Sequence, residues 1–395
     1  MEETKYRILV VHNRYQIPGG EDSVMEQEVR MLRSHGHQVF VYERNNAELS
    51  NLSFCQKLRL PFQVIYSRKT EREIRSLIRK HSIDLVHVHN TILLISPSVY
   101  DACRKENIPC VQTIHNFRMV CPNALLYRDG KVCTDCISHG LHCALKHRCY
   151  RNSKAETLCL VLSMRFNRMR GIFRYPYYIC LTEFNRKMLL KQGQIEESQI
   201  FLKPNSTQDP GAPLPASARS ETIVFAGRLE EIKGIRFLLH TWAEIGADAP
   251  ELLLYGDGPL EPECRAFLQS HPALPIRFFG RVSHETVLQA MRSASAVILP
   301  TQVYEGFPMI LAEAFSCGTP AIVPDFGNAG SLVQEGVTGW HYIPNDPESL
   351  IKVINHRTDL TESVYSAFRT YYSSEQNYRT LMKIYDAVLQ GKETR

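Results

Sequence analysis

Short β-branched runs that alternate with helix-length stretches constrain the fold of this chain more than any other feature. The alternation is typical of parallel sheets that helices cover on both faces, and it occurs twice. The strands expected in the first half are 6–11, 38–42, 84–88, 109–114 and 178–182, and those in the second half are 222–226, 251–255, 276–279, 296–299 and 320–323. We therefore predict an α/β protein with two doubly wound domains.

A proline-rich segment separates the two patterns. The proline and small polar residues of 204–215 disfavour regular structure and indicate a linker. With 395 residues the chain is also too long for one ordinary core. We predict a first domain over 1–205, a second over 206–370, and a C-terminal helix over 371–395 whose packing on the first domain the pattern leaves open.

The N-terminus and the charge balance bear on location and partners. The N-terminus, residues 1–5, lacks the apolar stretch of a signal peptide. No apolar run approaches the roughly 18 residues of a membrane-spanning helix. We expect a cytoplasmic protein in which the 12 cysteines are reduced thiols or metal ligands rather than disulfides. A net charge of +5 is too small to indicate nucleic-acid binding, but it suits phosphate-bearing ligands or an anionic surface.

Glycines and charged residues follow several predicted strands, at the edge where open α/β sheets bind ligands. Gly19 and Gly20 follow the first strand and would let the backbone approach a phosphate or sugar closely. Arg228 and Lys233, in the sequence GRLEEIKG, could converge on a pyrophosphate. Gly256 lies in GDGP, which lacks the third glycine of a dinucleotide fingerprint and indicates a turn near the ligand. Taken singly, each motif also fits a tight turn or solvated charges.

Two glutamates, Glu305 and Glu313, are separated by seven residues in the sequence YEGFPMILAE. Gly306 and Pro308 are expected to open a helix, whose unpaired N–H groups would suit an anion or sugar hydroxyls beside Glu305. At about 100° and roughly 1.5 Å per residue, the two carboxylates would share a face of that helix and line one elongated ligand. The alternative is an amphipathic helix with two solvated glutamates.

In this order, and together with FGRV at 279–282, AFSCGTPAIV at 314–323 and EGVTG at 335–339, these motifs resemble family 4 of the retaining glycosyltransferases over nearly the whole chain. The resemblance implies the GT-B fold, in which two Rossmann-like domains face a cleft. It also implies a hexosyltransferase-like enzyme that moves a sugar from a UDP- or GDP-sugar to a glycan or lipid-linked acceptor in surface polysaccharide synthesis. A GT-B epimerase or phosphorylase and a non-catalytic sugar-nucleotide-binding protein are the alternatives. No catalytic metal is expected, because no Asp-x-Asp follows a strand.

The resemblance also implies roles for individual residues. Arg228 and Lys233 would neutralise the diphosphate, Glu313 would accept hydrogen bonds from the ribose, and Glu305 would hold the transferred sugar. The residues expected to be catalytic are His115, Glu305, Arg228 and Lys233. The residues expected to bind the donor are Gly19, Gly20, Arg228, Lys233, Gly256, Arg281, Val282, Glu305, Gly306, Phe307, Met309, Ile310 and Glu313.

Three histidines in the first half are candidates for the acceptor side. His115 follows a predicted strand and matches the active-site histidine of the family, which is expected to contact the transferred sugar; a structural hydrogen bond is the alternative. His87 and His89 alternate along a strand and therefore point the same way. They fit either buried structural roles or a place in the cleft.

Residues 151–174 are basic and amphipathic. They carry six basic side chains and one acid, a local net charge of +5. Apolar residues recur beside these charges at helical spacing: Leu158, Leu162, Phe166, Met169 and Phe173. Either this helix packs in the core with solvated arginines, or it lies on an anionic membrane surface, which would place the enzyme peripherally on the inner face of a membrane.

The insertion 115–151 contains five cysteines within twenty-nine residues. The spacing C-x11-C-x2-C-x12-C from Cys121, Cys133, Cys136 and Cys149 includes the paired-cysteine knuckle of tetrahedral zinc sites. Some family 4 transferases resemble this stretch. We expect a structural zinc ion that takes no part in the chemistry, with free thiols as the alternative. Cys143 or a histidine could replace one member of the set.

Overall fold

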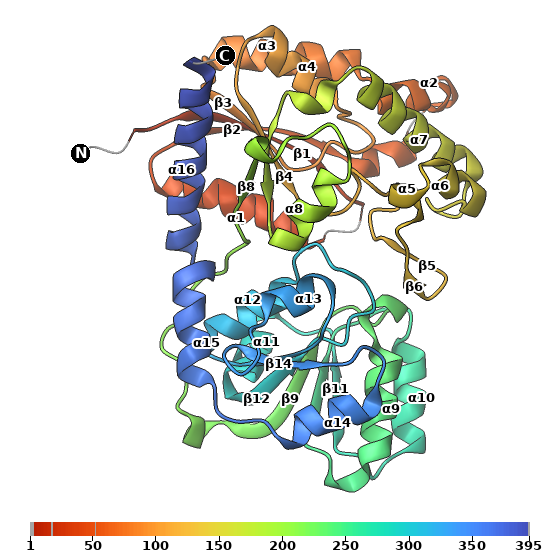
Figure 1. Cartoon of the computed structure of the whole chain (residues 1–395), viewed down its shortest axis with the longest axis vertical. Helices are drawn as coiled ribbons and strands as arrows, with labels where there is room; N and C mark the ends of the chain where they lie inside the picture. Colours follow the sequence, from red (N-terminus) through yellow and green to blue (C-terminus); the bar gives the residue numbers. More distant parts are fainter. Residues whose placement is uncertain (1–3, 17–18, 52, 394–395) are drawn as a thin grey trace. The chain divides into compact units, whose positions relative to one another are not determined.

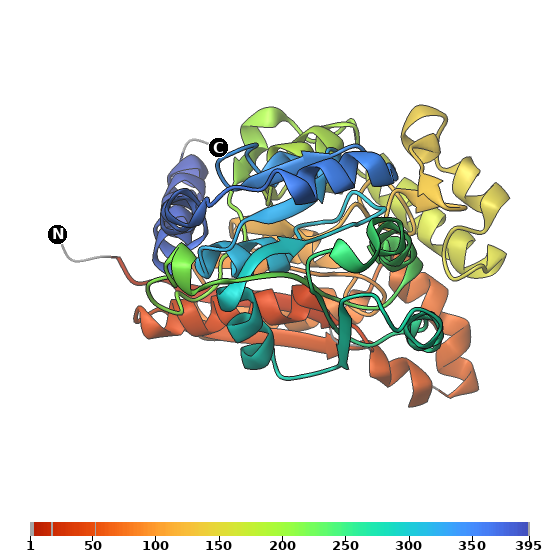
Figure 2. The same ribbon diagram turned by 90° about the horizontal axis from the view of Figure 1, so that it is seen from below.

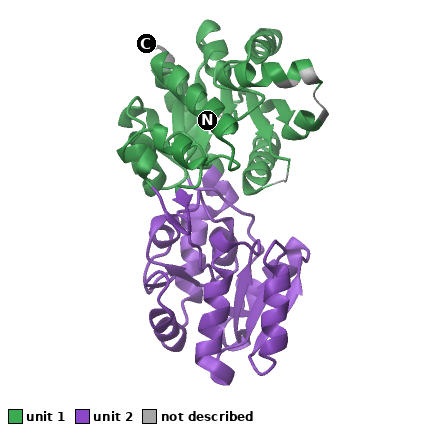
Figure 3. Ribbon diagram, turned by 90° about the vertical axis from the view of Figure 1, so that its right-hand side faces the viewer, with its two compact units in different colours: residues 1–126, 134–203, 378–395 green, residues 127–133, 204–377 purple. Residues whose placement is uncertain are grey.

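The computed structural model describes residues 4–16, 19–51 and 53–393 and consists of two compact units (Figure 3). Unit 1 comprises residues 1–126, 134–203 and 378–395, and unit 2 comprises residues 127–133 and 204–377. The main division therefore follows Lys203, two residues before the predicted boundary. Residues 1–3, which belong to the N-terminal segment considered above, lie outside the described part of the chain.

Unit 1 is built on a six-stranded parallel sheet in the order β2-β1-β3-β4-β7-β8. Its strands are β1 (Arg7–Arg14), β2 (Gln38–Asn45), β3 (Leu85–Val88), β4 (Cys110–Ile114), β7 (Tyr177–Cys180) and β8 (Ile200–Leu202). Its helices are α1 (Gly20–Ser34), α2 (Phe54–Ile65), α3 (Arg68–His81), α4 (Ser98–Lys105), α5 (Asp135–Ser138), α6 (His142–His147), α7 (Lys154–Met169) and α8 (Glu183–Leu190) (Figure 1). The strand order changes direction between β1 and β3, and doubly wound sheets bind ligands at the carboxyl ends of such strands.

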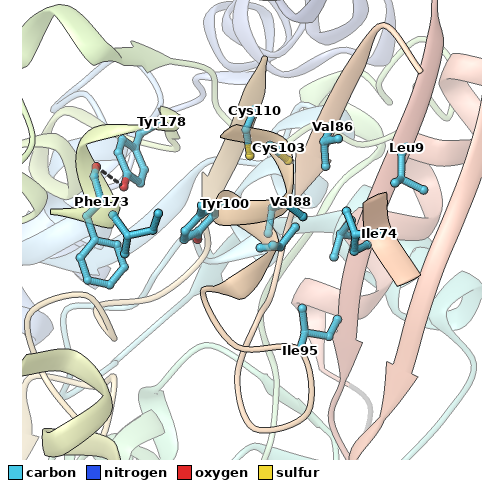
Figure 4. Packing of buried hydrophobic residues seen from close by; sticks show 14 of the residues in the cluster. Leu9, Ile74, Val86, Val88, Ile95, Tyr100, Cys103, Cys110, Phe173 and Tyr178 are labelled. Carbon is cyan, nitrogen blue, oxygen red and sulfur yellow. Dashed lines mark hydrogen bonds between the residues drawn. The ribbon is translucent and has the colours of Figure 1, made fainter. Parts of the chain in front are cut away.

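Both faces of this sheet are buried, which explains why its strands are apolar throughout rather than alternating. Ile8 and Val10 of β1 pack in a cluster with α1 and with the last part of α16 (Ser374–Glu393). Leu9 and Val11 point to the other face, where they pack with α3 and α4 (Figure 4). The last turns of α16 thus complete the core of unit 1, a placement that the sequence pattern left open.

Unit 2 also has a six-stranded parallel sheet, in the order β11-β10-β9-β12-β13-β14. Its strands are β9 (Ser220–Ala226), β10 (Leu252–Tyr255), β11 (Ile276–Gly280), β12 (Ala294–Ile298), β13 (Ala321–Pro324) and β14 (Gly339–Tyr342). Its helices are α9 (Ile235–Ile245), α10 (Glu261–Ser270), α11 (His284–Ser293), α12 (Met309–Ser316), α13 (Gly327–Leu332), α14 (Pro347–Asn355) and α15 (Thr361–Ala367). A short antiparallel ribbon of β5 (Tyr127–Arg128) and β6 (Lys131–Val132) is grouped with this unit. The order of the large sheet reverses between β9 and β12, which marks the expected ligand position.

The prediction of two doubly wound α/β domains is confirmed, and each of the ten predicted strands overlaps an observed one. The edge strands β8 and β14 were not predicted. Within the described residues, no helix is both long and apolar enough to span a membrane.

Candidate functional sites of the two units

The loops that follow the strands of unit 2 pack closely on one another. Gly256 has φ +129°, and a Cβ atom there would lie 1.9 Å from the carbonyl oxygen of Gly227. Gly234 has φ +71°, and a Cβ atom there would lie 1.8 Å from the carbonyl oxygen of Pro300. Both positions therefore require glycine for backbone geometry and for space. These contacts set the loops after β9, β10 and β12 against each other at the point where the strand order reverses.

At this reversal the structure brings Lys233 and Glu305 together. The ammonium group of Lys233 donates to Oε1 of Glu305 over 2.7 Å, and the hydroxyl of Thr301 donates to the same oxygen over 2.9 Å. Among the described residues none donates to Oε2 of Glu305, so this oxygen can accept a hydrogen bond from a ligand. The side chains of Lys233 and Glu305 are 24% and 13% exposed, which lets a ligand reach them while limiting solvent screening.

Glu305 does not lie on a helix, and the expectation that it shares a helix face with Glu313 is wrong. Helix α12 begins at Met309, after the cap residue Pro308, and Glu305 has φ +50° in the preceding loop. The residue before a proline avoids the helical conformation, so Phe307 cannot extend the helix toward Glu305. The amide of Asn328 donates to the carbonyl oxygens of Glu305 and Gly306, over 2.8 and 2.9 Å, and holds this left-handed turn.

Other predicted donor-binding residues have their own partners. Nε2 of His284 on α11 lies 3.0 Å from Oε1 of Glu313, and this hydrogen bond raises the pKa of His284. Arg228 is paired with Glu230 over 2.6 Å, so its guanidinium does not join the Lys233–Glu305 pair. Arg281, 81% exposed, lies 3.6 Å from Asp257. The remaining positions are Val282, half-buried after β11, Gly306 and Phe307 in the loop before α12, and Met309 and Ile310 in its first turn.

In unit 1, Gly19 and Gly20 lie at the start of α1, where Gly19 is the cap residue and Gly20 the first helical residue. The carboxylate of Asp22 accepts a hydrogen bond from the backbone N–H of Gly19 over 2.9 Å, and its other oxygen lies 2.7 Å from Nε2 of the buried His12. A Cβ atom at either glycine would meet nothing within 4 Å. Steric packing within unit 1 therefore does not explain why these two positions are occupied by glycine.

His115 lies at the wall of a cavity of about 100 Å³ within unit 1. Apolar and polar residues line this cavity in similar numbers, and the polar ones include His89, Asn116, Arg118 and Arg168. A cavity with several convergent polar groups is a candidate small-molecule site.

His115 contacts a buried network of polar side chains. Nε2 of His115 is 3.0 Å from Nδ1 of His89. Oε1 of Glu28, on α1, is 3.2 Å from Nε2 of His89 and 2.9 Å from Nδ1 of His87. The ammonium group of Lys203 donates to Oε2 of Glu28 over 3.1 Å. Both strand histidines thus point the same way, as predicted, and they are buried.

The ionisation states in this network favour one arrangement of protons. Burial alone would raise the pKa of Glu28, but Lys203, His87 and His89 hold it well below its usual range. Burial, together with the neighbouring His87, lowers the pKa of His89 to about 4, and burial lowers the pKa of His115 as well. A carboxylate beside Nε2 of the neutral His89 favours the proton on that nitrogen, so its Nδ1 accepts from Nε2–H of His115. Nδ1 of His115 is then an acceptor for a ligand hydroxyl.

One group of side chains within the described residues could hold a metal ion. Its ligand atoms, from Glu28, His87 and His89, all lie within 4.8 Å of one another. The ammonium group of Lys203, only 2% exposed, already supplies the positive charge that Glu28 needs. We therefore interpret this group as a lysine-neutralised polar cluster, in which Oε1 of Glu28 and Nε2 of His89 are close but make no hydrogen bond among the described residues.

Glu21 is a further group that the sequence analysis missed. Its Oε2 lies 3.3 Å from the hydroxyl of Tyr15 and accepts from the amide of Asn116 over 3.2 Å. Its Oε1 is buried and has no hydrogen-bond partner among the described residues. Burial, reinforced by the charge of Asp22, raises the pKa of Glu21 to about 8. A buried carboxyl with a raised pKa beside Asn116, the residue that follows His115, is a candidate for a functional site.

The sequence analysis also did not identify Thr301, Asn328, His284, Glu28 and Lys203. Only Thr301 gives a sequence signal, because it closely follows a predicted strand in the loop that carries Glu305. The others reach the two sites from helices or from distant strands.

Comparisons with known proteins agree with this description. The family model described as "Glycosyltransferase Family 4" matches residues 18–206, and the one described as "Glycosyl transferases group 1" matches residues 220–358. A phosphatidyl-myo-inositol mannosyltransferase of Mycobacterium tuberculosis (strain CDC 1551 / Oshkosh) is 30% identical over 355 residues, which cover 85% of this chain and 82% of that protein. A lipopolysaccharide 1,6-galactosyltransferase of Escherichia coli (strain K12) is 26% identical over 186 residues, 45% of this chain and 51% of that protein. This chain matches only 19% of the length of one other relative and 64% of the length of another.

Solved structures share the fold. A glycosyltransferase from Rickettsia africae ESF-5 superimposes with a TM-score of 0.70 at 17% identity, over 98% of this chain and 99% of that one. The Anabaena protein HepE in complex with UDP superimposes with a TM-score of 0.65 at 14% identity, over 96% of this chain and 100% of that one. The predicted GT-B fold class is thereby confirmed.

Proposed function

Because the chain belongs to family 4 of the glycosyltransferases, also described as group 1, we propose that it is a glycosyltransferase that moves a sugar from a UDP- or GDP-sugar to a glycan or lipid-linked acceptor with retention of configuration. The observation that carries the proposal is the group formed by Lys233, Glu305 and Thr301 at the strand reversal of unit 2. It combines a cation for a diphosphate with a carboxylate oxygen that can accept from sugar hydroxyls.

The chemistry needs few reacting protein groups. The bond between the anomeric carbon and the diphosphate breaks, the bond to the acceptor oxygen forms on the same face, and the acceptor proton passes to the leaving phosphate. Negative charge grows on the diphosphate as its bond breaks, so a cation held in place there stabilises the transition state. Lys233 can fill that role because Glu305 and the surrounding loops fix its position before the donor arrives. We assign Arg228 to the same phosphate, Glu313 to the ribose, and the backbone at 281–282 to the base.

Unit 1 supplies the neutral groups. With Nε2 of His115 donating to His89, its Nδ1 accepts from a hydroxyl of the transferred sugar. Glu21 keeps its proton at neutral pH and donates from its buried carboxyl to an oxygen of the bound substrate. Both groups are uncharged at pH 7, which suits a reaction whose new negative charge develops on the diphosphate.

Relatives support the choice of donor and pathway. HepE has been seen in complex with UDP and with UDP-glucose, which favours a UDP-sugar donor. The named relatives include a lipopolysaccharide galactosyltransferase and a phosphatidyl-myo-inositol mannosyltransferase. These likenesses support our proposal of a role in surface polysaccharide synthesis with a lipid-linked acceptor.

The proposal is tested by incubating the protein with a panel of UDP- and GDP-sugars and measuring release of the nucleoside diphosphate. We expect slow hydrolysis of one donor without an acceptor, and a faster reaction once a suitable acceptor is present. A protein that binds none of the nucleotide sugars would contradict the proposal. Binding without release in the presence of acceptors would favour the non-catalytic alternative, and conversion to an isomeric nucleotide sugar would favour an epimerase.

We propose further that α2 and α7 dock on an anionic membrane. The two helices pack against each other at the periphery of unit 1 (Figures 1 and 2). Their outer faces expose large apolar side chains, of which Phe62 is 73% and Met169 is 81% exposed. The others are Leu58, Leu158, Leu162 and Phe166. Exposed basic side chains accompany them, namely Arg59, Arg151, Lys154, Arg165 and Arg174. Apolar side chains next to basic ones match the interface of an anionic bilayer, where each basic residue adds about 1 kcal/mol.

The structure corrects two details of the sequence prediction for this helix. Phe173 is buried in the core of unit 1 and does not belong to the exposed stripe. Arg170 pairs with the buried Asp101, and Arg168 donates to the carbonyl oxygen of Met119, so these two charges point inward. The remaining basic residues of the helix carry the attraction to lipid.

Vesicle sedimentation tests the membrane surface. We expect binding to vesicles that contain phosphatidylglycerol, loss of binding in high salt, and weaker binding of the double variant Phe62→Ser, Met169→Ser. Ile343→Ser is the control, because Ile343 is an apolar residue of unit 2 that is also largely exposed, at 61%. Equal binding to neutral vesicles, or none to either kind, would contradict this surface.

A further inference from the structure

Two arginines of unit 1 line the cavity of His115 without a carboxylate partner. They are Arg118 and Arg168, and both are half-buried. The other half-buried arginines of unit 1 each pair with a carboxylate, namely Arg14, Arg44, Arg75, Arg170 and Arg186. Among the described residues, neither Arg118 nor Arg168 forms such a pair, and no Asp or Glu lines the cavity. The wall of this cavity therefore carries two positive charges that the chain does not neutralise.

The protein does not use all the hydrogen-bonding capacity of these two guanidinium groups. Each group carries five N–H donors. Nη1 of Arg118 donates to the carbonyl oxygen of Pro122 over 2.7 Å, and Nη2 of Arg168 donates to that of Met119 over 2.9 Å. The Nε atoms of both arginines are buried and have no hydrogen-bond partner within the described part of the chain. Partly satisfied, buried cations cost free energy, which an anion at the cavity wall would offset.

The other groups near the two arginines are uncharged at neutral pH. The ring of Tyr150 lies against Arg118, with its centroid 5.5 Å from Cζ. Glu21 also lies near Arg118, but its pKa of about 8 leaves it largely protonated at pH 7. Burial lowers the pKa of His89 to about 4 and also lowers the pKa of Arg168. A bound anion would favour the charged form of the arginine and reverse the effect of burial.

The loop 119–122 holds the two arginines in place. Met119 and Pro122, whose carbonyl oxygens accept from them, also line the cavity. The backbone N–H of Cys121 donates to the carbonyl oxygen of Phe117 over 2.9 Å and closes the turn. Cys121 was expected to bind zinc, but no three cysteines of the described residues have sulfur atoms within 4.8 Å of one another, so the zinc ion stays a prediction. The structure shows the loop held by hydrogen bonds, two of them from the arginines.

We propose that Arg118 and Arg168 bind a phosphate group of the acceptor, so that the acceptor is a phosphate-bearing compound. This inference rests on the proposed function, because it names the acceptor of that transfer. Two fixed positive charges match the nearly double negative charge of a phosphate monoester, whereas a carboxylate carries only one. Guanidinium groups also bind phosphate oxygens through paired N–H groups, which favours arginine at such a site.

The rest of the cavity bears on what is attached to the phosphate. Its volume of about 100 Å³ is several times the roughly 10–15 Å³ that a water molecule needs, so a phosphate group can enter. Val64 of α2 and Leu160 and Met164 of α7 supply an apolar part of the wall. These are the two helices that we propose to dock on a membrane, where a lipid headgroup would supply the phosphate. A phosphorylated sugar would supply the same group from solution.

Hydrogen–deuterium exchange of the full-length wild-type protein tests the subsite without any substitution. The probes are dihexanoyl phosphatidic acid, glucose 1-phosphate and glucuronate. We expect the two phosphate probes to slow exchange of the backbone amides of 117–122. Protection at a lower concentration of the lipid probe would identify a lipid phosphate, and the reverse order a soluble one; either order supports the subsite. Absence of protection by both phosphates, or equal protection by glucuronate, would overturn the proposal.

Variants then assign the binding to the two arginines. Arg118→Gln and Arg168→Gln should each raise the calorimetric Kd of the tighter phosphate probe at least about tenfold. Arg72→Gln, an exposed arginine on α3, is the matched control and should keep the wild-type Kd. A wild-type Kd in both cavity variants would overturn the assignment.

The donor assay on the wild type separates this proposal from the proposed function. Protection of 117–122 by the phosphate probes without hydrolysis of any nucleotide sugar would support the anion subsite and contradict the proposed transfer. Hydrolysis of a nucleotide sugar without that protection would overturn the subsite and leave the proposed transfer standing.

Discussion

The two units share one architecture but place their functional groups in opposite ways. Unit 1 buries its charges in an internal network, in which Lys203 neutralises Glu28 and His89 lies between Glu28 and His115. Unit 2 leaves its paired charges, Lys233 with Glu305, open enough for a ligand to reach. Buried charges that are already paired can fix the orientation and protonation of a neighbouring side chain, here that of His115. Accessible pairs can exchange one protein partner for a charged ligand. This difference suits a neutral contact with a sugar in unit 1 and a diphosphate in unit 2.

We expect the largest effect at the donor site that we propose in unit 2. Glu305→Gln removes the charge that holds Lys233 and weakens the acceptor for sugar hydroxyls, so the rate of donor turnover should fall by about 10²-fold. The variant should remain folded, because Glu305 lies in a loop and its backbone is held by Asn328. Glu285→Gln, an exposed glutamate on α11, is the control and should turn over normally. Unchanged turnover in Glu305→Gln would mean that the accessible pair is only structural.

A smaller effect is expected from the buried network of unit 1. Glu28→Gln keeps the shape of the side chain but removes the charge that favours the proton on Nε2 of His89. We expect kcat to fall about tenfold with little change in the donor KM, because His115 then samples the wrong tautomer. Nitrogen chemical shifts of the histidine rings should show the change of tautomer directly. Unaltered ring shifts together with a lower kcat would contradict a positioning role for Glu28.

The sequence predicted which loop residues come together in unit 2 better than it predicted the buried network of unit 1, for a physical reason. Lys233 and Glu305 lie in loops directly after β9 and β12, and the order of strands in a doubly wound sheet brings such loops together. The network of unit 1 combines α1, β3, β4 and a residue after β8, and no local spacing predicts which side chains of separate elements will meet. The wrong part of the unit 2 prediction was also local, because Pro308 delays the helix until Met309 and removes Glu305 from it.

A pH-dependent effect on stability should distinguish Glu21 from ordinary surface carboxylates. The pKa of Glu21 is raised to about 8 in the folded protein, from an ordinary value of 4.5. Between these values the folded state binds more protons than the unfolded state, so this group makes the protein less stable as the pH rises from 4.5 toward 8. The Glu21→Gln variant lacks this titrating carboxyl and should therefore not lose this stability as the pH rises. Thermal unfolding at several pH values should therefore show the variant gaining stability relative to wild type with increasing pH.

The gain for Glu21→Gln should stay below the limit of about 1.4 kcal/mol per pH unit for one proton, because the side chain is partly exposed. The two tryptophans, Trp242 and Trp340, both belong to unit 2, so unfolding must also be followed by circular dichroism to include unit 1. A stability difference that does not vary with pH would contradict the raised pKa.

We propose that unit 2 binds the nucleotide and that unit 1 contacts the transferred sugar. Calorimetric binding of the nucleoside diphosphate tests this assignment most directly. The measurement compares wild type, Glu313→Ala and His115→Ala with UDP or GDP, whichever the wild type binds. We predict that Glu313→Ala raises the Kd at least about tenfold, because we propose that Glu313 of unit 2 binds the ribose, whereas His115→Ala leaves the Kd within about twofold although donor turnover falls. Equal weakening in both variants, or weakening in His115→Ala alone, would contradict the assignment of the nucleotide to unit 2.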